Sequence, residues 1–480
     1  MLAPMRFRFL NEVHAVRDAA DWNDATLGKL WLYNLHYFDD LSATDASERV
    51  QWHSTLIERW IAENPPTAGN GWEPYPTSLR IVNWIRWASA GHPLPPHFED
   101  SLAQQVRWLA QRVEHHLMAN HLFVNAKALT MAGVWFAGPE ADAWRADGVR
   151  LIQRELPLQI LSDGAHFERS PMYHALFAED VLDLVNLARS YPGVIPADDL
   201  ETWSGAARRM LDWLTVLTHP DGQIAFFNDA AFGIAPGASA LLAYAARLGL
   251  DATPQAIRLA GSGYHRVDRG GAVLLLDAAP VGPDEQPGHA HADTLSFELS
   301  IDRQRVFVNG GTSTYTSGPL RDFERSTAAH NTVEIEGQDS SEVWGGFRVA
   351  RRARILDVLV DESLTRSRIV ASHSGYMRLP GRPIHEREWI MTDHTLRVID
   401  RVRSRRTVHA VGRFLLHPAV SVTATGGLRL AHGRECQWRV QGGIAALRAA
   451  HWAPEFGLRL DTTCIDVTLH ERDTEFIVEW

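Results

Sequence analysis

Cysteine is nearly absent from this chain, which has only Cys436 and Cys464 among its 480 residues. This excludes a disulfide framework and a zinc cluster held by thiolates, and it favours a reduced, half-buried pair. No uninterrupted apolar run approaches the ~18 residues that a membrane helix needs, so we expect no membrane insertion. The N-terminal residues also lack the apolar segment and the small-residue cleavage site of a secretion signal. The default expectation is a cytoplasmic protein, or a periplasmic one if the true start lies upstream.

Positive charge is scarce as well, because 47 Lys and Arg face 58 Asp and Glu and leave a net charge of −11. This balance argues against nucleic acids and membrane surfaces as partners. A polyanionic ligand would therefore need a local basic cleft. Arg321, Arg325 and Arg348 lie in the loop-rich stretch 318–354 and are candidates for its lining, or they are ordinary solvated arginines.

Tryptophan, in contrast, is abundant, with 17 residues. Flat indole faces pack well against sugar rings, but the packing of helices against one another accounts for the same number. We favour core packing as the main explanation.

The chain is longer than one ordinary core supports, so two domains are expected. Apolar residues recur at i, i+3, i+4 and i+7 between about residues 45 and 255, which predicts consecutive antiparallel helices that close into a ring or part of one. The predicted helices are 47–63, 77–90, 98–117, 122–137, 143–156, 173–191, 201–219 and 239–250.

After about Gly261 the apolar period changes to two, in many short runs of β-branched and aromatic residues bounded by Gly, Asp, Asn or Pro. This pattern predicts a large antiparallel β-sandwich. We place the domains at 1–255, which is helical, and 256–480, which is built of strands.

Asn120 and His121 directly precede an apolar helix in MANHLFVNAKAL. One interpretation is a helix N-cap, because the side-chain oxygen of Asn accepts a free backbone N–H. The functional alternative is that the Asn120 amide donates to a substrate carboxylate. Asn125 lies on the same helix, but its spacing does not suit this role and we treat it as structural.

Tyr173 follows Ser170-Pro171, which places it in the first turn of a predicted helix, beside the loop 162–166. The structural interpretation is a tyrosine that anchors a helix end through its hydroxyl. The functional one is a phenol that faces a cleft. Glu168 and Asp163 lie in the same loop and are the carboxylates that a hydrolase would use.

His289, His291 and Asp293 alternate in GHAHADTLSFEL, at the predicted head of a strand. A period of two would put all three on one face. Two histidines at i and i+2 on a strand form half of a typical metal site, and His330 in STAAHNTVEIEG could complete it. This alternation favours function over a purely structural role.

Trp72, Tyr75 and Arg80 lie at a loop-to-helix junction in GWEPYPTSLRIVNWIRW. These residue types suit stacking on sugars and pairing with acid groups, so we predict that they contact substrate.

The segments GWEPYPTSLRIVNWIRW, ANHLFVNAKAL, FERSPMYH, GHAHADTLSFEL, NGGTSTY and STAAHNTVEIEG, in this order, resemble the heparinase II/III family of polysaccharide lyases. The resemblance runs from about residue 30 to beyond 355. It implies an incomplete (α/α) toroid followed by an antiparallel β-sandwich. It also implies cleavage of acidic polysaccharides by β-elimination, which leaves a 4,5-unsaturated uronate.

The resemblance carries over to individual residues. Asn120 matches the carboxylate-neutralising position, Tyr173 the catalytic tyrosine and His289 the catalytic histidine. Catalysis needs no cofactor, but some members hold a structural zinc at positions that correspond to His291, Asn309 and His330. An acid of the family's zinc set is replaced here by Asn309, a poorer ligand than a carboxylate, so the sequence leaves the zinc open.

The chemistry of elimination explains why an amide, a phenol and an imidazole are needed together. Donors such as Asn120, helped by Arg80 or His121, would stabilise the charge that develops on the uronate carboxylate. Tyr173 could act as both base and acid, or His289 could be the base and Tyr173 the acid for the opposite C5 epimer. We expect Arg321, Arg325 and Glu168 to assist in substrate binding.

Three alternatives remain from the sequence alone. A glycoside hydrolase would use two carboxylates, such as Asp163 or Glu168 with Asp229. A non-catalytic protein that binds acidic glycans would keep the Trp and Arg lining but tolerate the loss of Tyr173. A lyase of polysaccharide export or synthesis would act on the cell's own polymer. The sequence names neither the polymer nor the oligomeric state.

Overall fold

The computed structural model describes residues 1–251, 258, 259 and 261–480. The predicted domain boundary, between residues 255 and 256, lies outside the described residues. The chain divides into two compact units. Unit 1 is Met1–Gln159 with Asp180–Ser204, and unit 2 is Ile160–Glu179 with Gly205–Trp480. Two helices therefore run through both units.

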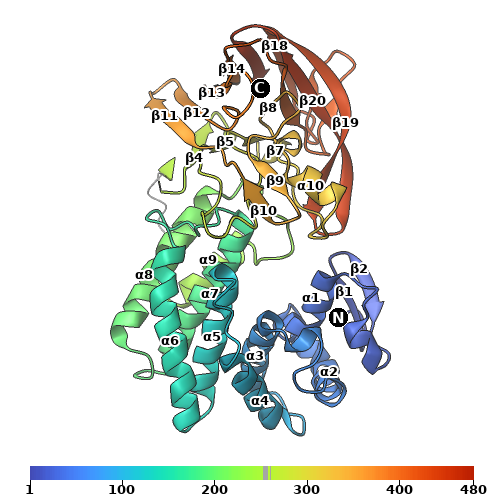
Figure 1. The fold of residues 1–480 in the computed structure, drawn as a ribbon, viewed down its shortest axis with the longest axis vertical. Helices are drawn as coiled ribbons and strands as arrows, with labels where there is room; N and C mark the ends of the chain where they lie inside the picture. Colours follow the sequence, from blue (N-terminus) through green and yellow to red (C-terminus); the bar gives the residue numbers. More distant parts are fainter. Residues whose placement is uncertain (252–257, 260) are drawn as a thin grey trace. The chain divides into compact units, whose positions relative to one another are not determined.

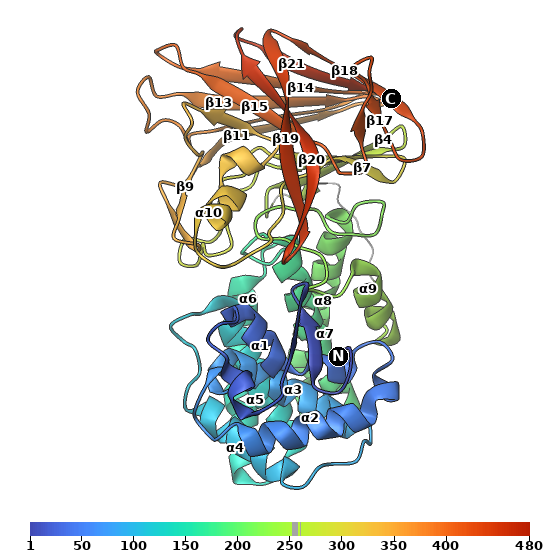
Figure 2. The ribbon, with the colours of Figure 1, turned by 90° about the vertical axis from the view of Figure 1, so that its right-hand side faces the viewer.

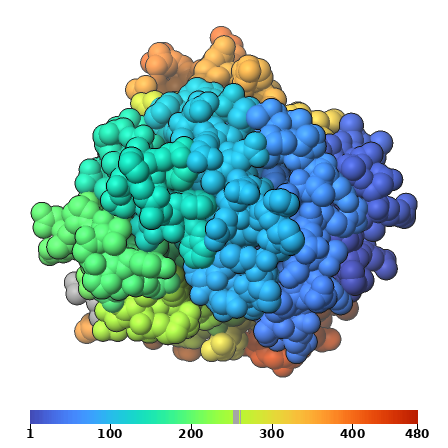
Figure 3. Space-filling model, turned by 90° about the horizontal axis from the view of Figure 1, so that it is seen from below, coloured from blue at the N-terminus to red at the C-terminus, as the bar shows by residue number. Residues whose placement is uncertain are grey.

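Unit 1 is helical apart from one short N-terminal hairpin (Figure 1). Its elements are β1 (Arg6–Phe9), β2 (Glu12–Ala15), η1 (Ala19–Asn23), α1 (Lys29–Tyr37), η2 (Asp39–Ser42), η3 (Ala46–Arg49), α2 (Val50–Glu63), η4 (Asn70–Trp72), α3 (Pro74–Ser89), α4 (Phe98–Ala110), α5 (Ala119–Trp135) and α6 (Pro139–Gln159). The two shared helices are α7 (Pro171–Ser190) and α8 (Ala197–Val216). On the face drawn in Figure 3, the blue and cyan segments of unit 1 follow one another in chain order, as expected for consecutive antiparallel helices.

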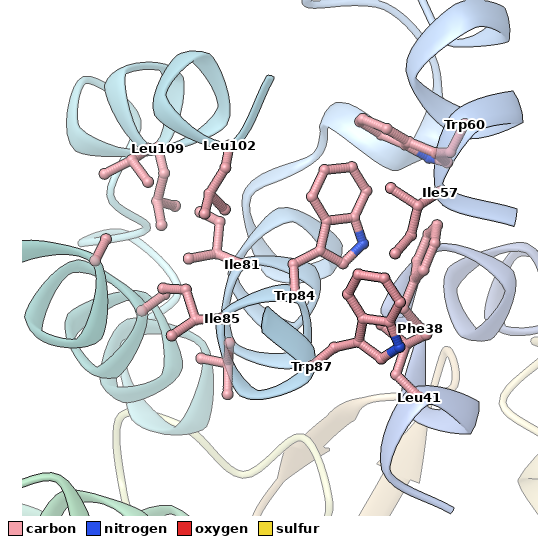
Figure 4. Close-up of a cluster of buried hydrophobic side chains, with 14 of the residues drawn as sticks. Phe38, Leu41, Ile57, Trp60, Ile81, Trp84, Ile85, Trp87, Leu102 and Leu109 are labelled. Carbon is pink, nitrogen blue, oxygen red and sulfur yellow. The ribbon is translucent and has the colours of Figure 1, made fainter. Parts of the chain in front are cut away.

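The core of unit 1 is built largely from tryptophan, which confirms that packing explains most of the tryptophan content. Trp60 and Trp84 meet edge to face with ring centroids 5.6 Å apart, and Phe38 packs on Trp84 at 5.5 Å (Figure 4). All three side chains are buried. These large faces fill the space between α2 and α3 and fix how the two helices pack.

The helix predicted over residues 98–117 is shorter in the structure. Helix α4 ends at Ala110, and α5 already begins at Ala119. The backbone N–H of Glu114 donates to Oδ1 of Asn125 at 2.8 Å, and Asn125 Nδ2 donates to Glu114 Oε2 at 3.1 Å. Because this side chain supplies partners outside the helical pattern, the residues before α5 leave the helix. Asn125 is thus structural, as predicted.

A buried histidine in this core makes unit 1 sensitive to acid. Trp60 Nε1 donates to His36 Nδ1 at 3.0 Å, and His36 Nε2 donates to the carbonyl of Trp22 at 3.0 Å. This pattern requires the neutral ring. Burial, with help from the charge of Arg80, lowers the pKa of His36 from 6.5 to about 3.

We therefore expect His36 to stabilise the fold fully above pH 6.5 and to lose this contribution as the pH falls from 6.5 towards 3. In this pH range His36 binds a proton in the unfolded chain but not in the folded chain. The free energy of unfolding therefore falls by about 1.4 kcal/mol per pH unit. In His36→Gln, which keeps a donor and an acceptor, the free energy of unfolding should fall less steeply over this range. Urea unfolding at several pH values measures the slopes, and equal slopes would contradict the assignment.

Unit 2 contains the strand-rich C-terminal part. Its remaining elements are α9 (Ala238–Arg247), β3 (Arg258–Leu259), β4 (Tyr264–Arg269), β5 (Ala272–Asp277), β6 (Phe297–Ile301), β7 (Gln304–Phe307), α10 (Pro319–Arg325), η5 (Thr327–Ala329), β8 (Val333–Ile335), β9 (Glu342–Trp344), β10 (Arg348–Ala350), β11 (Ile355–Glu362), β12 (Ser367–His373), β13 (Ile384–Met391), β14 (Thr395–Arg403), β15 (Ala410–Leu415), β16 (Ser421–Val422), β17 (Leu428–Arg429), β18 (Glu435–Gln441), β19 (Gly443–Glu455), β20 (Leu458–Leu469) and β21 (Thr474–Glu479).

The larger sheets of unit 2 are antiparallel (Figure 2). Their strand orders are β11-β12-β13-β14-β21-β18-β17-β16, β19-β20-β15-β8 and β3-β4-β5-β6-β7. One strand from each sheet contributes a phenylalanine to a common core. Phe414 stacks on Phe476 at 3.9 Å, and Phe307 meets Phe476 edge to face at 5.6 Å. The predicted fold class, a helical toroid followed by an antiparallel sandwich, is confirmed.

Both cysteines are free, and both are fully buried in this unit, whereas the sequence predicted a half-buried pair. Among the described residues, no helix is long and apolar enough to cross a membrane.

Candidate active site

The carboxylate of Asp229 is the centre of a buried polar cluster in unit 2. His289 Nδ1 donates to its Oδ2 at 2.9 Å, and His291 Nε2 donates to its Oδ1 at 2.8 Å. Arg321 binds both oxygens through Nη1 and Nη2, and Thr312 Oγ1 donates to Oδ1 at 3.2 Å. Burial alone would raise the pKa of Asp229, but Arg321 and the two histidines hold it well below its usual value. Asp229 is therefore ionised and fixed.

This arrangement sets the tautomer of the neutral His289 ring. Its Nδ1 faces a carboxylate that can only accept, so Nδ1 carries the proton and Nε2 of the neutral ring has a free lone pair. The side chain is 20% exposed, whereas Asp229 is fully buried. His289 can thus take a proton from a ligand that reaches it from solvent.

Tyr173 lies directly against His289. The phenol and imidazole rings are stacked, with centroids 3.8 Å apart and an interplanar angle of 29°. Tyr173 is in the first turn of α7, as predicted, and its hydroxyl is 2.9 Å from that of Tyr315. Burial raises the pKa of Tyr315 well above 10, so Tyr315 keeps its proton and can donate to the Tyr173 oxygen. The structure thus brings together two of the three predicted catalytic residues.

Strained backbone conformations occur next to these side chains. Asn228, which precedes Asp229, has φ 57°, and Arg169, in the loop before α7, has φ 58°. In unit 1, Met118 and Ala119, which precede Asn120, have φ 52° and 47°. Such angles cost non-glycine residues about 1 kcal/mol or more and gather at functional sites, where the surrounding structure enforces them.

The strand predicted at His289 is not present in the structure. Residues 288–293 are irregular, and β6 begins only at Phe297. His289 and His291 nevertheless reach the same carboxylate, while Asp293 accepts from the backbone N–H of Asn228 at 2.9 Å. The histidines converge because Asp229 lies between their rings, and they do not share the face of a strand.

The predicted zinc ligands do not fit a zinc site. His291 Nδ1 and His330 Nε2 lie 3.1 Å apart and could form two ligands. Asn309, however, donates through Nδ2 to the carbonyl of Phe226 at 2.9 Å, and its Oδ1 accepts from the N–H of Asn331 at 3.0 Å. No group of three His, Cys, Asp or Glu in the described part of the chain is placed to hold a metal ion. Asn309 as a ligand is thus wrong, because its amide is committed to the backbone.

We expect the purified protein to carry well under one zinc per chain, and dialysis against a chelator to leave its thermal midpoint unchanged. Zinc sites of this kind need at least three protein ligands, which this cluster does not provide. Elemental analysis and thermal unfolding before and after dialysis measure both quantities. One zinc per chain, lost together with a drop in the midpoint, would show that Asn309 rearranges to bind it.

The other predicted catalytic residue, Asn120, lies in unit 1 at the second position of α5. The N-cap is Met118, so the capping interpretation of Asn120 is wrong. Its Nδ2 donates to the hydroxyl of Tyr75 at 3.1 Å, and its Oδ1 is buried with no hydrogen-bond partner among the described residues. His121 packs on the Tyr75 ring at 4.4 Å, and its Nδ1 is 3.1 Å from Glu114 Oε1. Tyr75 and His121 are both partly exposed.

The predicted substrate contacts of Trp72 and Arg80 are wrong, because both side chains are buried. Trp72 is buried in the tryptophan core. Arg80 is fully buried, donates through Nε to Gln105 at 2.8 Å and stacks over the Trp60 ring at 3.8 Å. Arg80 is buried because α3 turns this face inward. Trp72, in η4 just before α3, packs on Trp60 and Trp108.

Three further predicted contacts in unit 2 are also buried. Arg321 is occupied by Asp229, and Arg325 donates to the carbonyl of Ala290 at 2.9 Å. Glu168 is 2% exposed. Arg321 and Arg325 position the 289–291 segment and do not line a basic cleft, so their predicted role as substrate contacts is wrong. The burial of Glu168 shows that its predicted role as a substrate contact is wrong as well.

The carboxylates of the hydrolase alternative are committed elsewhere. Asp229 accepts hydrogen bonds from His289, His291 and Arg321. Asp163 Oδ2 accepts from the backbone N–H and the hydroxyl of Ser262, each at 2.7 Å. A hydrolase needs one protonated and one free carboxyl group next to the sugar, and these residues do not provide that pair.

Sequence reasoning missed the positioning role of Asp229 and the contribution of Tyr315 and Phe347. Phe347 meets Tyr315 edge to face at 5.3 Å and His289 at 6.2 Å. Tyr315 belongs to the NGGTSTY segment, which offered a signal. Nothing local marks the AFFNDA segment of Asp229, because its side-chain partners are 60 or more positions away in the sequence.

The chain is similar in sequence and in fold to known proteins. The chain is 24% identical over 273 residues to heparin-sulfate lyase of Pedobacter heparinus, which covers 50% of this chain and 39% of that one. It is 24% identical over 342 residues to FtsZ-localized protein C of Caulobacter vibrioides, covering 69% of this chain and 56% of that one. The chain thus spans about half the length of the curated relatives it matches.

A solved heparinase III structure has the same fold. It superimposes with a TM-score of 0.70 at 18% identity, over 94% of this chain and 76% of the other.

Two family descriptions match adjoining parts of the chain, Heparinase II/III N-terminus over residues 51–238 and Heparinase II/III-like, C-terminal over residues 251–480. Because the two matches together span most of the sequence, the chain belongs to the heparinase II/III family.

Proposed function

We propose that this protein is a polysaccharide lyase that cleaves an acidic, uronate-containing polysaccharide by β-elimination. The observation that carries the proposal is the stacked pair of Tyr173 and His289, with His289 held by the ionised Asp229. The pair offers one base and one acid, both reachable from solvent, and the nearby carboxylates are unavailable for hydrolysis. The heparin-sulfate lyase relative and the family match support the same class of reaction.

The first chemical step is removal of the C5 proton of the uronate. Neutral His289 accepts this proton at Nε2, and the imidazolium that forms is stabilised by Asp229 through Nδ1. Positioned acid–base groups of this kind contribute about 100- to 10,000-fold to a rate. Asp229 also keeps the ring from rotating, so Nε2 stays directed at the ligand.

The second step is departure of the sugar oxygen O4. The Tyr173 hydroxyl protonates it as the C4–O4 bond breaks, and the C4–C5 double bond forms from the electrons of the lost C–H bond. For the opposite C5 epimer, Tyr173 as phenolate takes the proton and returns it to O4. The Tyr315 hydroxyl, 2.9 Å away, would stabilise that phenolate by donating to it.

The charge that develops on the uronate carboxylate needs a donor, and we propose Asn120, a residue of unit 1, for this role because it matches the family's carboxylate-neutralising position. Its amide makes one hydrogen bond, to Tyr75, and leaves the other end without a partner among the described residues. The two ends of an amide are interchangeable by a flip, which would place NH₂ where the unpartnered oxygen lies while the oxygen accepts from Tyr75. A buried polar atom without a partner is costly to the fold, which makes Asn120 a candidate for a binding role.

The proposed substrates are glycosaminoglycans and related uronate polymers. The test is to incubate the protein with heparan sulfate, chondroitin sulfate, hyaluronan and alginate, and to follow the ultraviolet absorbance of the unsaturated uronate. A rise with at least one polymer supports the proposal. New reducing ends without that absorbance would indicate a hydrolase, and binding without either would indicate a non-catalytic glycan-binding protein.

A further inference from the structure

A two-stranded hairpin in unit 2 exposes large aromatic side chains beside the candidate active site. We call residues Glu342–Ala350 the aromatic hairpin; it consists of β9, a turn and β10. Trp344 is 50% exposed and Phe347 is 40% exposed. All 17 tryptophans lie in the described part of the chain, and Trp344 is the one among them with an exposed side chain. An exposed indole costs the fold the burial of a large apolar surface, so it calls for an explanation.

The turn of the aromatic hairpin is tied to the catalytic cluster. Gly345 and Gly346 have φ 58° and 78°, which glycine adopts without strain. The Nε of Arg321 donates to the carbonyl of Gly346 at 3.1 Å, while its two other nitrogens bind Asp229. One buried guanidinium therefore fixes both the hairpin turn and the carboxylate that orients His289.

The turn of the aromatic hairpin reaches His289 through Phe347. Phe347 is in the turn, with its ring centroid 6.2 Å from that of His289 and 5.3 Å from that of Tyr315. Trp344 and Arg348 are directly paired across the two strands, so their side chains lie on the same face. A ligand bound at His289 and Tyr173 would therefore lie beside the hairpin.

Charge on the hairpin complements an acidic sugar. The guanidinium of Arg348 lies over the Trp344 ring, 4.8 Å from its centroid, and its side chain is exposed. An indole face accepts the C–H surface of a sugar ring, and a guanidinium binds carboxylate or sulfate with two hydrogen bonds. Protein partners usually bury about 800 Å² per side, far more than a turn with two aromatic side chains offers. This combination fits a glycan residue better than a protein.

We propose that the aromatic hairpin is a sugar-binding platform that holds an acidic residue of the polymer next to the bond cleaved at Tyr173 and His289. The inference rests on the proposed function for the position of the scissile bond. Trp344 supplies the stacking surface and Arg348 the charge, and neither takes part in proton transfer. Their effect is on affinity and on the choice of substrate.

The test compares Trp344→Ala with Trp344→Phe in two measurements. The first is the dissociation constant of the most tightly bound polymer among heparan sulfate, chondroitin sulfate, hyaluronan and alginate, determined by calorimetry in the inactive Tyr173→Phe background. The second is the KM and kcat of the otherwise wild-type enzyme. Loss of the indole should weaken binding and raise KM by about five- to tenfold, with kcat changed far less. Trp344→Phe, which keeps an aromatic face, should recover most of the loss.

Leu447, which is 52% exposed, provides the matched control, because Leu447→Ala removes a comparable apolar surface outside the hairpin. It should change neither binding nor kinetics. Unchanged affinity and KM in Trp344→Ala, with cleavage intact, would overturn the platform and leave the proposed function standing. Binding that depends on Trp344, without any unsaturated product, would contradict the proposed function and leave the hairpin as a sugar-binding surface. Failure of the wild-type chain to bind any of the four polymers would contradict both.

Discussion

Replacement of Tyr173 by phenylalanine should abolish formation of unsaturated product, lowering kcat by about 1,000-fold or more, while polymer binding is retained. The substitution removes one oxygen from a partly exposed ring and keeps the stacking on His289. In the proposed mechanism this oxygen is the group that protonates O4. Ultraviolet absorbance measures the rate, and calorimetry with the same polymer measures the affinity.

Tyr315→Phe is the matched control for this prediction, because it removes the other hydroxyl of the same 2.9 Å pair. In the proposed mechanism Tyr315 supports Tyr173 and does not protonate the leaving oxygen, so we expect a loss of about tenfold or less, the size of one lost hydrogen bond. A Tyr173→Phe protein that keeps more than a tenth of the wild-type rate would remove Tyr173 from the mechanism. A larger effect of Tyr315→Phe than of Tyr173→Phe would reverse the two roles.

Asp229→Asn should give the second large effect, on both rate and stability. An amide nitrogen facing His289 would force the ring into the tautomer with Nε2 protonated, which cannot accept the C5 proton, and we expect a loss of about 100- to 10,000-fold in kcat. Arg321, fully buried, would lose its counter-charge, at a cost of about 3–5 kcal/mol in the free energy of unfolding. Kinetics and urea unfolding measure the two effects.

The double variant Asp229→Asn/Arg321→Met separates these effects. It removes the unpaired buried charge, so it should recover part of the stability while the rate stays low. Thr312→Val is a mild control, since it removes only the 3.2 Å hydrogen bond to Oδ1 and should cost about 1 kcal/mol with little change in rate. Recovery of the rate in the double variant would show that Asp229 acts through folding alone.

Tyr173 and His289, the proposed catalytic pair, could be singled out from the sequence because each lies in a locally recognisable segment. Tyr173 follows a Ser-Pro helix start, and His289 belongs to a His-x-His motif; both signals depend on neighbours within a few positions. The two periods of the apolar pattern likewise predicted a helical part followed by a strand-rich part. These features follow from local backbone preferences, which the sequence expresses directly.

The surroundings of the pair were not predictable in the same way. Asp229 meets Arg321 across 92 positions, and no local pattern records such a contact. The predicted contacts Trp72 and Arg80 have the composition of a sugar site, but the tertiary packing of unit 1 buries both. The long hairpin of β19 and β20 was missed because alanine-rich GIAALRAAHWAPE has weak strand preference and is held by pairing with β20.

The aromatic hairpin shows the same limit. WGGF marks a tight turn between two aromatic residues, but exposure of Trp344 is a tertiary property that sequence cannot give. Polar or aromatic residue types therefore identify candidates, and only burial decides which of them a ligand can reach.

The most direct test of the central claim is mass spectrometry of the products formed in water labelled with heavy oxygen. Elimination through Tyr173 and His289 breaks the C4–O4 bond without consuming water. We therefore expect one fragment to carry an unsaturated uronate, one water lighter than a hydrolysis product, with no heavy oxygen in either fragment. Heavy oxygen at the new reducing end, with saturated uronate in both fragments, would contradict the account.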